Sequence, residues 1–164
     1  MTEARLTDEQ FVRLVIQEIG DRPNSSLAQL VYLLQRSGAP SRYRFDYARF
    51  LGMWNSAFEG SVEAERFRLL LGKNGLPEEE GSELRAELRE LVARLPSDDH
   101  DLRLVAVADF LRRNGCDSRA GVPLEMMLER VKPELAPGGM MSGREVLDCL
   151  ERLELATQSG DRAA

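Results

Sequence analysis

Apolar residues recur every three to four positions along most of the chain, a spacing typical of amphipathic helices. The stretches with this pattern are residues 8–19, 27–35, 57–71, 78–95, 97–113, a shorter run after Pro123 and a last run after Ser142. Four of them begin with Ser or Thr followed three positions later by Gln or Glu, the signature of a capping box. The pairs are Thr7 with Gln10, Ser26 with Gln29, Ser56 with Glu59 and Ser142 with Glu145. The pattern therefore predicts a mainly helical chain.

Two of these helices are predicted to supply much of the core. The helix at 27–35 is apolar over most of its circumference, so it should be central and buried. Its apolar residues are Leu27, Leu30, Val31, Leu33 and Leu34. The helix at 57–71 is expected to turn one apolar side inward. The residues predicted to be buried on that helix are Val62, Phe67, Leu70 and Leu71.

Between these two helices the pattern changes from helical spacing to alternation. Aromatic residues occupy every second position from Tyr43 to Tyr47. Alternation together with aromatic enrichment favours a short strand near 43–50. Phe50 and Leu51 break the alternation, so the beginning of a helix is the alternative interpretation.

The length and composition set the scale of the fold. The chain has 164 residues, enough for one compact domain that buries roughly 70% of its unfolded surface. We predict a single multi-helix domain over residues 1–156, with at most the one short strand, and a flexible tail over residues 157–164. Apolar residues make up 43% and charged residues 30% of the sequence, the proportions of an ordinary soluble protein.

The order of these signals resembles that of a known family. Residues 27–35 read LAQLVYLLQ, residues 43–47 follow the pattern Y-x-F-x-Y, and a glycine turn with an aromatic residue comes next. A later stretch, LRLVAVADFL, is followed by a short helix, by KPEL and by a last helix. Over residues 8–155 the chain resembles the YwgA-like bacterial and archaeal proteins and, more distantly, the Panacea domain of SocA-type antitoxins.

This resemblance implies a helical fold with a winged-helix-like core, and a role as an antitoxin, adaptor or regulator rather than as an enzyme. The chain departs from the family at the glycine turn, which reads Gly52-Met53-Trp54-Asn55 and lacks the family's proline, tyrosine and serine. It also carries a predicted charged helix, residues 78–95, where a wing hairpin would lie. A missing wing disfavours DNA binding.

The distribution of charge limits the classes of partner. The net charge is −6, and the excess of acidic residues lies in the last two thirds of the chain. An acidic surface repels phosphate, which disfavours non-specific binding of nucleic acid. No apolar run approaches 18 residues and the first ten residues contain no apolar signal core, so we predict a cytoplasmic protein without membrane contact.

Residues suited to catalysis are few. His100 is the only histidine, and it stands among acidic residues that suit a helix cap, so we interpret it as a capping or solvated residue. Cys116 and Cys149 lack the spacing of a metal or redox motif and are interpreted as reduced core thiols. We therefore predict no catalytic residue, no metal site, no cofactor and no enzymatic activity.

A cluster of arginines lies in the least acidic part of the chain. Residues 36–58 contain four arginines and one acid, Asp46, a local charge of 4 − 1 = +3. Together with a neighbouring Met and Trp, these arginines form the predicted partner-binding set. The set is Arg36, Arg42, Arg44, Arg49, Met53 and Trp54. The alternatives are that the arginines form a solvated face paired with acidic helices and that Trp54 belongs to the core.

Two functions remain open at this point. The first is a regulatory or adaptor protein that acts by contact with another protein or with a second copy of itself. The second is a DNA-binding regulator that places the helix at 57–71 in the major groove. Its nucleic-acid contacts would come from Arg66, Arg68 and Lys73, with Glu63 beside them.

Overall fold

The computed structural model describes residues 5–72, 75–115 and 123–153. Over these ranges the fold consists of seven helices and one two-stranded antiparallel sheet. The elements are α1 (Asp8–Ile19), α2 (Asn24–Arg36), β1 (Asp46–Ala48), β2 (Gly52–Trp54), α3 (Ser56–Leu70), α4 (Ser82–Arg94), α5 (Asp99–Arg113), α6 (Leu124–Leu135) and α7 (Gly143–Arg152). The prediction of a mainly helical fold is confirmed, while the winged-helix-like core remains a prediction.

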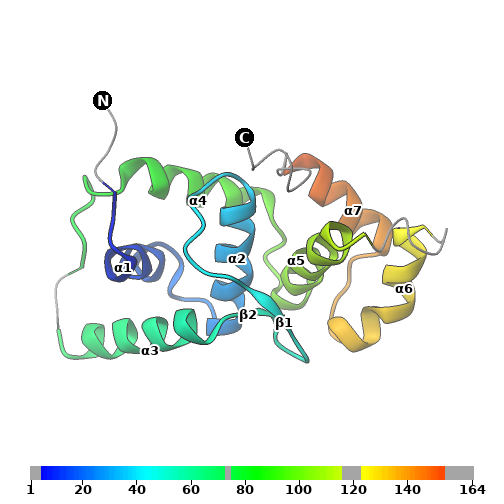
Figure 1. Cartoon of the computed structure of the whole chain (residues 1–164), viewed down its shortest axis with the longest axis horizontal. Helices are drawn as coiled ribbons and strands as arrows, with labels where there is room; N and C mark the ends of the chain where they lie inside the picture. Colours follow the sequence, from blue (N-terminus) through cyan, green and yellow to red (C-terminus); the bar gives the residue numbers. More distant parts are fainter. Residues whose placement is uncertain (1–4, 73–74, 116–122, 154–164) are drawn as a thin grey trace.

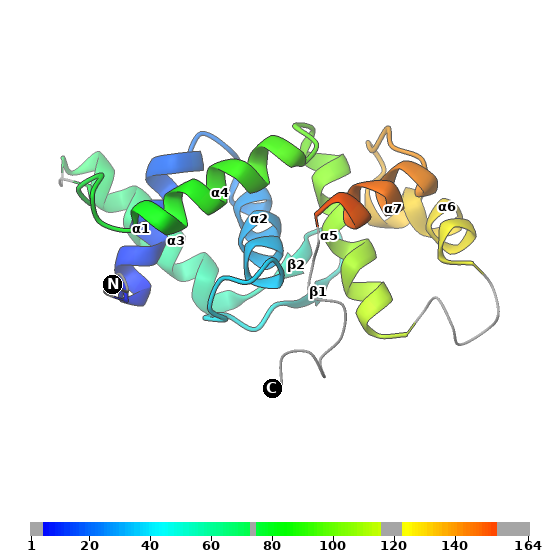
Figure 2. The ribbon, with the colours of Figure 1, turned by 90° about the horizontal axis from the view of Figure 1, so that it is seen from above.

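Helix α2 is the centre of the molecule. It stands between α1 and α3 on one side and α5 on the other, in both the front view (Figure 1) and the view from above (Figure 2). Every residue from Ser26 to Arg36 is buried, which confirms the predicted burial of its apolar residues Leu27, Leu30, Val31, Leu33 and Leu34. Helices α6 and α7 pack beyond α5, and α4 runs along the opposite edge from the small sheet (Figure 1).

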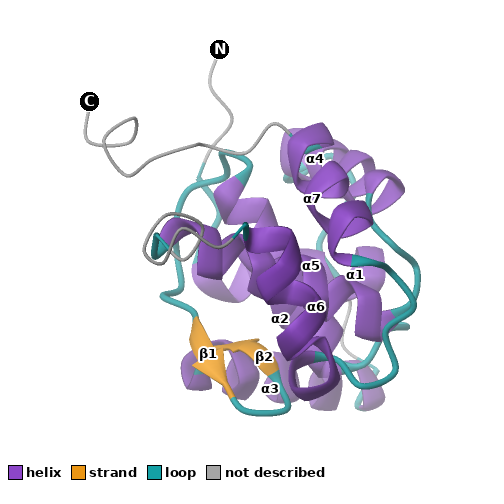
Figure 3. Ribbon diagram, turned by 90° about the vertical axis from the view of Figure 1, so that its right-hand side faces the viewer, coloured by secondary structure: helices purple, strands orange, loops and turns teal. Residues whose placement is uncertain are grey.

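The two strands form a hairpin beside the first half of α2, at the lower edge of the molecule in Figure 3. Asp46 pairs with Trp54 and Ala48 with Gly52. The short strand predicted near 43–50 is therefore present over β1, and its partner β2 was not predicted. Before β1 the aromatic side chains of Tyr43 and Phe45 turn inward and are buried.

Two of the four predicted capping boxes form, those at the starts of α1 and α7. The other two predictions are wrong. Because α2 begins at Asn24, Ser26 and Gln29 lie inside the helix and their side chains bind other elements. Helix α3 is capped by Asn55, whose side-chain oxygen accepts a hydrogen bond from the backbone N–H of Phe58 at 2.8 Å.

The start of α4 also differs from its prediction, because the helix begins at Ser82 instead of directly after Pro77. The guanidinium of the buried Arg85 donates to the backbone oxygens of Leu76, Pro77 and Glu80 at 3.0–3.2 Å. These carbonyl groups are thereby satisfied outside a helix, so the segment before Ser82 is a loop.

Helix α3 faces the core with a different side from the one predicted. Its buried residues are Phe58, Val62 and Glu65. At about 100° per residue these three share one face, whereas Phe67, Leu70 and Leu71 point away from it. Leu70 is 86% exposed and Phe67 is 62% exposed, so the prediction that they are buried is wrong. Glu65 completes the buried face because Arg13 and Arg68 neutralise its carboxylate.

Candidate interaction surface

A buried side chain, Gln29 of α2, holds strand β2 in place. Its amide nitrogen donates to the backbone oxygens of Leu51 and Met53, both at 3.0 Å, and its oxygen accepts the backbone N–H of Met53 at 2.9 Å. Gln29 is 1% exposed, so these hydrogen bonds are shielded from water. Strand β2 is therefore fixed to α2 through its backbone groups.

Gly52 is required where β2 meets α2. Its φ is +81°, and a Cβ at this position would lie 2.8 Å from the side-chain oxygen of Gln29 and 2.6 Å from Cγ of Arg103. The absence of a side chain lets the strand approach the helix closely enough for the Gln29 hydrogen bonds.

The extended segment before the hairpin is fixed by a second buried glutamine, Gln35. Its oxygen accepts the backbone N–H groups of Arg42 and Tyr43 at 2.9 and 3.0 Å, and its nitrogen donates to the backbone oxygen of Tyr43 at 2.9 Å. The rings of Tyr43 and Phe45 pack edge-on against Phe58 of α3. The base of the hairpin is thus bound on both sides by polar and aromatic contacts.

Beyond this base the hairpin ends in an exposed turn, residues 47–51, which we call the hairpin tip. The backbone N–H of Leu51 donates to the oxygen of Ala48 at 3.0 Å and closes a four-residue turn. Phe50 is the third residue of that turn, with φ at 68°, the sign that a type II turn normally assigns to glycine. Among the described residues it alone combines a side chain with positive φ.

The hairpin tip presents apolar and basic groups together. Phe50 is 62% exposed, and Tyr47 and Leu51 beside it are exposed as well. The guanidinium carbon of Arg49 lies 4.9 Å from the centre of the Phe50 ring. Arg44 and Asp46 are both exposed at the foot of the hairpin, so the cationic group next to the apolar tip is Arg49.

Two of the predicted partner-binding arginines are not part of this surface. Arg36 is 4% exposed, and its Nε donates to the carboxylate of Asp109 at 2.8 Å. The side chain of Arg42 is also buried, with NH1 2.8 Å from Asp8 and the guanidinium over the ring of Phe11. The interpretation that both present their charge outward is wrong, because a buried carboxylate and an aromatic ring inside the fold hold them.

The remaining members of the predicted set divide in the same way. Arg44 and Arg49 are exposed, as a contact role requires. Met53 is fully buried and belongs to the core. Trp54 is partly buried at the end of β2, opposite Asp46. The arginine cluster of the sequence is therefore split by the fold into two internal and two external residues.

The residues of the DNA-binding alternative are engaged within the chain. Arg66 donates to the side-chain oxygen of Asn24 and to the backbone oxygens of Gly20 and Arg22, all at 2.7–2.8 Å. Arg68 forms ion pairs with Glu9 and Glu65. Glu63 accepts a hydrogen bond from Asn24, and Lys73 lies outside the described residues. Arg66 is not available to a base or phosphate without losing these partners, because all three of its guanidinium nitrogens are engaged, whereas the side chain of Arg68 is 41% exposed.

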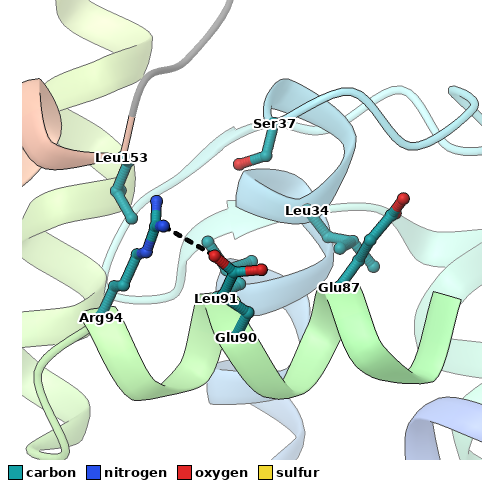
Figure 4. A pocket seen from close by; sticks show the side chains of 7 residues that line it. All are labelled: Leu34, Ser37, Glu87, Glu90, Leu91, Arg94 and Leu153. Carbon is teal, nitrogen blue, oxygen red and sulfur yellow. Dashed lines mark hydrogen bonds and ion pairs between the residues drawn. The ribbon is translucent and has the colours of Figure 1, made fainter. Parts of the chain in front are cut away.

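A pocket lies near the C-terminal end of α2, between α2 and α4 (Figure 4). Its volume is about 260 Å³, and its apolar lining comes from Leu34, Leu91 and Leu153. Glu87 and Glu90 of α4 add carboxylates to its edge. Glu90 is paired with Arg94 at 2.7 Å, as the dashed line in Figure 4 marks.

The residues singled out for chemistry do not assemble into a reactive site in the described part of the chain. The backbone N–H of His100 donates to Asp98, which caps α5, and the imidazole packs against Gly138. Cys149 is buried, and burial raises the pKa of its thiol above the ordinary value, which leaves a poor nucleophile. Cys116 lies outside the described residues.

The described residues also lack a metal-binding cluster and a membrane-spanning helix. No three His, Cys, Asp or Glu side chains come together as a set that would hold a metal ion. None of the helices in those ranges combines the length and apolar character needed to cross a membrane.

Comparison with known proteins found no family model, no curated protein and no solved structure that matches this chain. The resemblance to the YwgA-like proteins and the Panacea domain therefore remains a prediction.

The sequence interpretation missed Phe50, Leu51 and Tyr47 as surface residues. A signal was present, because Phe50 and Leu51 interrupt the alternation of the aromatic segment. Placing the interruption at an exposed turn requires β2 as the second strand, and β2 has only three residues and no alternating pattern of its own.

Proposed function

We propose that this protein is a cytoplasmic adaptor or regulator without enzymatic activity, which acts by binding another protein chain through the hairpin tip. The antitoxin-like or regulator-like role implied by the family resemblance is part of this proposal. The observations that support this proposal are the positive φ of Phe50 and the exposure of its side chain.

The backbone at Phe50 favours glycine, and the contact of the ring with the guanidinium of Arg49 leaves most of the aromatic side chain exposed. The left-handed conformation costs an L-residue with a side chain about 1–2 kcal/mol, a cost that glycine does not have. Burial of the ring within the chain offsets little of this cost, since the residue is 62% exposed. Burial of the ring by a partner would offset the backbone cost, and this explains why a phenylalanine occupies the position. Aromatic and arginine side chains are also those that dominate protein interfaces.

The hydrogen bonds that hold the backbone on either side of the hairpin tip support the same function. Gln29 and Gln35 fix the backbone on both sides of the hairpin, so Phe50 is presented from a rigid base. A preorganised contact residue loses little conformational entropy on binding, which increases affinity. The buried thiol of Cys149 and the structural use of Arg66 and Arg68 favour protein contact over catalysis or DNA binding.

A pull-down with matched bait variants tests this proposal. Wild-type protein, Phe50→Gly and Phe67→Ser are used as baits in a lysate of the organism that encodes the chain. Phe67 is the control because it has the same 62% exposure but lies on α3, away from the hairpin. We expect wild type and Phe67→Ser to recover the same protein chain in stoichiometric amount, and Phe50→Gly to lose about 90% or more of it.

Equal recovery by Phe50→Gly and wild type would refute the role of the hairpin tip. Recovery of no stoichiometric protein chain by the wild type, combined with salt-sensitive binding to a specific DNA, would favour the DNA-binding alternative.

A further inference from the structure

We propose that the hairpin tip binds a second copy of this same chain, inserting Phe50 into the pocket between α2 and α4. This inference rests on the proposed function, because it names the partner of the hairpin tip. It follows from the complementarity of two surfaces, the hairpin tip and the pocket near the C-terminal end of α2.

The pocket has the size that a phenyl ring requires, and three of its lining residues are apolar, the others being Ser37, Glu87, Glu90 and Arg94. Leu34, Leu91 and Leu153 provide apolar contacts, and the volume is about 260 Å³. A cavity of roughly 150 Å³ in a protein interior is large enough to bind benzene. The pocket therefore has room for the ring of Phe50 and for part of Leu51 beside it.

The charges around the two surfaces have opposite signs. Glu87, Glu90 and Arg94 line the edge of the pocket, and because Arg94 pairs with Glu90, the negative charge without an ion pair within the described residues is that of Glu87. Helix α2 ends at this pocket, where its last carbonyl groups contribute negative partial charge. The hairpin brings Arg49 next to Phe50, so insertion of the ring places a guanidinium near these carboxylates.

One molecule does not fill its own pocket with its own tip. Gln29, in the first half of α2, holds the hairpin, while Leu34 lines the pocket near the end of the same helix. Figure 1 shows the hairpin at one edge of the molecule and α4 at the other. Two copies related by a two-fold axis can exchange both tips and form a closed dimer, whereas a single contact leaves one tip and one pocket free for a third copy.

Sedimentation velocity over a range of protein concentrations tests this arrangement. We expect the average mass of the wild type to rise with concentration, to a dimer where both tips are exchanged and beyond a dimer where each pair forms a single contact, with association in the micromolar range. Phe50→Gly and the double variant Glu87→Lys/Glu90→Lys should each weaken self-association by about 10-fold or more. Raised salt should weaken the wild-type association as well, because the charges at the edge are exposed.

A mixture of the two variants gives the decisive result. Phe50→Gly keeps an intact pocket, and the double Lys variant keeps an intact tip. Neither should self-associate, yet the mixture should form a heterodimer of one copy each that grows no further. Thermal unfolding followed by circular dichroism establishes that both variants are folded, and the single variant Glu87→Lys replaces the double variant if the latter is not.

Three results would overturn this inference: a wild type that stays monomeric at every concentration, a Lys variant that self-associates like the wild type, or a mixture without heterodimer. None of them refutes the proposed function, which depends on the pull-down with Phe50→Gly. Loss of the recovered chain in that pull-down without any self-association would identify a different protein as the partner.

Discussion

Phe50 holds its backbone in a conformation that its own side chain disfavours. The conformation is imposed from both sides, because Ala48 accepts the hydrogen bond that closes the turn and the backbone oxygen of Leu51 is bound by Gln29. Strain at a single exposed residue persists when the surrounding structure determines it. The strain can be measured independently of any partner.

Replacing Phe50 by Gly and by Ala separates this strain from the loss of the ring. Both variants remove the aromatic side chain, but only Gly adopts positive φ without cost. Relief of about 1–2 kcal/mol, less the greater unfolded-state entropy of Gly, leaves Phe50→Gly about 1 kcal/mol more stable than Phe50→Ala. Urea unfolding of the two proteins measures the difference.

The neighbouring Arg49 supplies the control, since its φ is not positive. There the order should reverse, with Arg49→Ala at least as stable as Arg49→Gly. Equal stabilities of the two Phe50 variants would show that the turn relaxes without strain.

At the scale of elements, the contact between α2 and β2 is made by side-chain amide and backbone groups instead of by apolar packing alone. The side-chain amide of Gln29 hydrogen-bonds the backbone N–H and oxygen of Met53, as a neighbouring strand would at this edge of β2. A glutamine in an apolar helix is predicted from sequence as a solvated or capping residue. Its actual position is explained by the need to satisfy the buried backbone groups of Leu51 and Met53.

Gln29→Leu should therefore destabilise the protein by about 2–4 kcal/mol, because several buried backbone groups lose their partner at once. Gln10→Leu is the control, since it removes a glutamine that serves only the exposed cap of α1, at a cost of about 1 kcal/mol or less. Urea unfolding measures both, and hydrogen exchange at the Met53 amide reports the local opening. A cost for Gln29→Leu no larger than that of the control would contradict this role.

Helix α3 shows why periodicity alone does not identify a buried face. Its apolar residues lie on two sides, and the side with Phe58 and Val62 is the buried one. Glu65 extends that buried side as a charged residue, while Phe67 and Leu70 remain exposed. The side of α3 that faces inward depends on α1, because Arg13 of α1 pairs with the carboxylate of Glu65 and allows it to be buried.

At the scale of the whole molecule, a buried ion pair joins the two central helices. Arg36 of α2 and Tyr32 one turn earlier both donate to the carboxylate of Asp109 in α5, at 2.8 and 2.7 Å. Asp109 is fully buried. Burial, together with the charge of Asp109, raises the pKa of Tyr32 well above its ordinary value, so Tyr32 remains a hydrogen-bond donor.

Arg36→Met should cost about 3–5 kcal/mol, because it leaves the carboxylate of Asp109 buried without its main cation. The double variant Arg36→Met/Asp109→Leu should recover most of that loss, since the unpaired charge is then gone. Arg144→Met is the control: its pair with Asp148 is exposed, and its loss should change stability by less than about 1 kcal/mol.

Urea unfolding of the four proteins gives the energies. A double variant no more stable than Arg36→Met would mean that packing, and not the buried charge, dominates at this site.

The sequence by itself determined the helices and most of the core. Helical spacing and capping residues are local properties, so the bounds of α1 and the burial of α2 follow from short stretches of chain. The approximate place of β1 was also local, because alternation of aromatic residues does not depend on distant contacts.

Only the tertiary structure decided which polar side chains face inward and which apolar side chains face solvent. Arg36 is internal because Asp109, 73 residues later, is placed opposite it. Phe50 is external because Gln29 binds the backbone on the far side of its turn. These contacts join residues distant in sequence, and a local pattern of polarity contains no information about which distant partner will satisfy a charge or a backbone group.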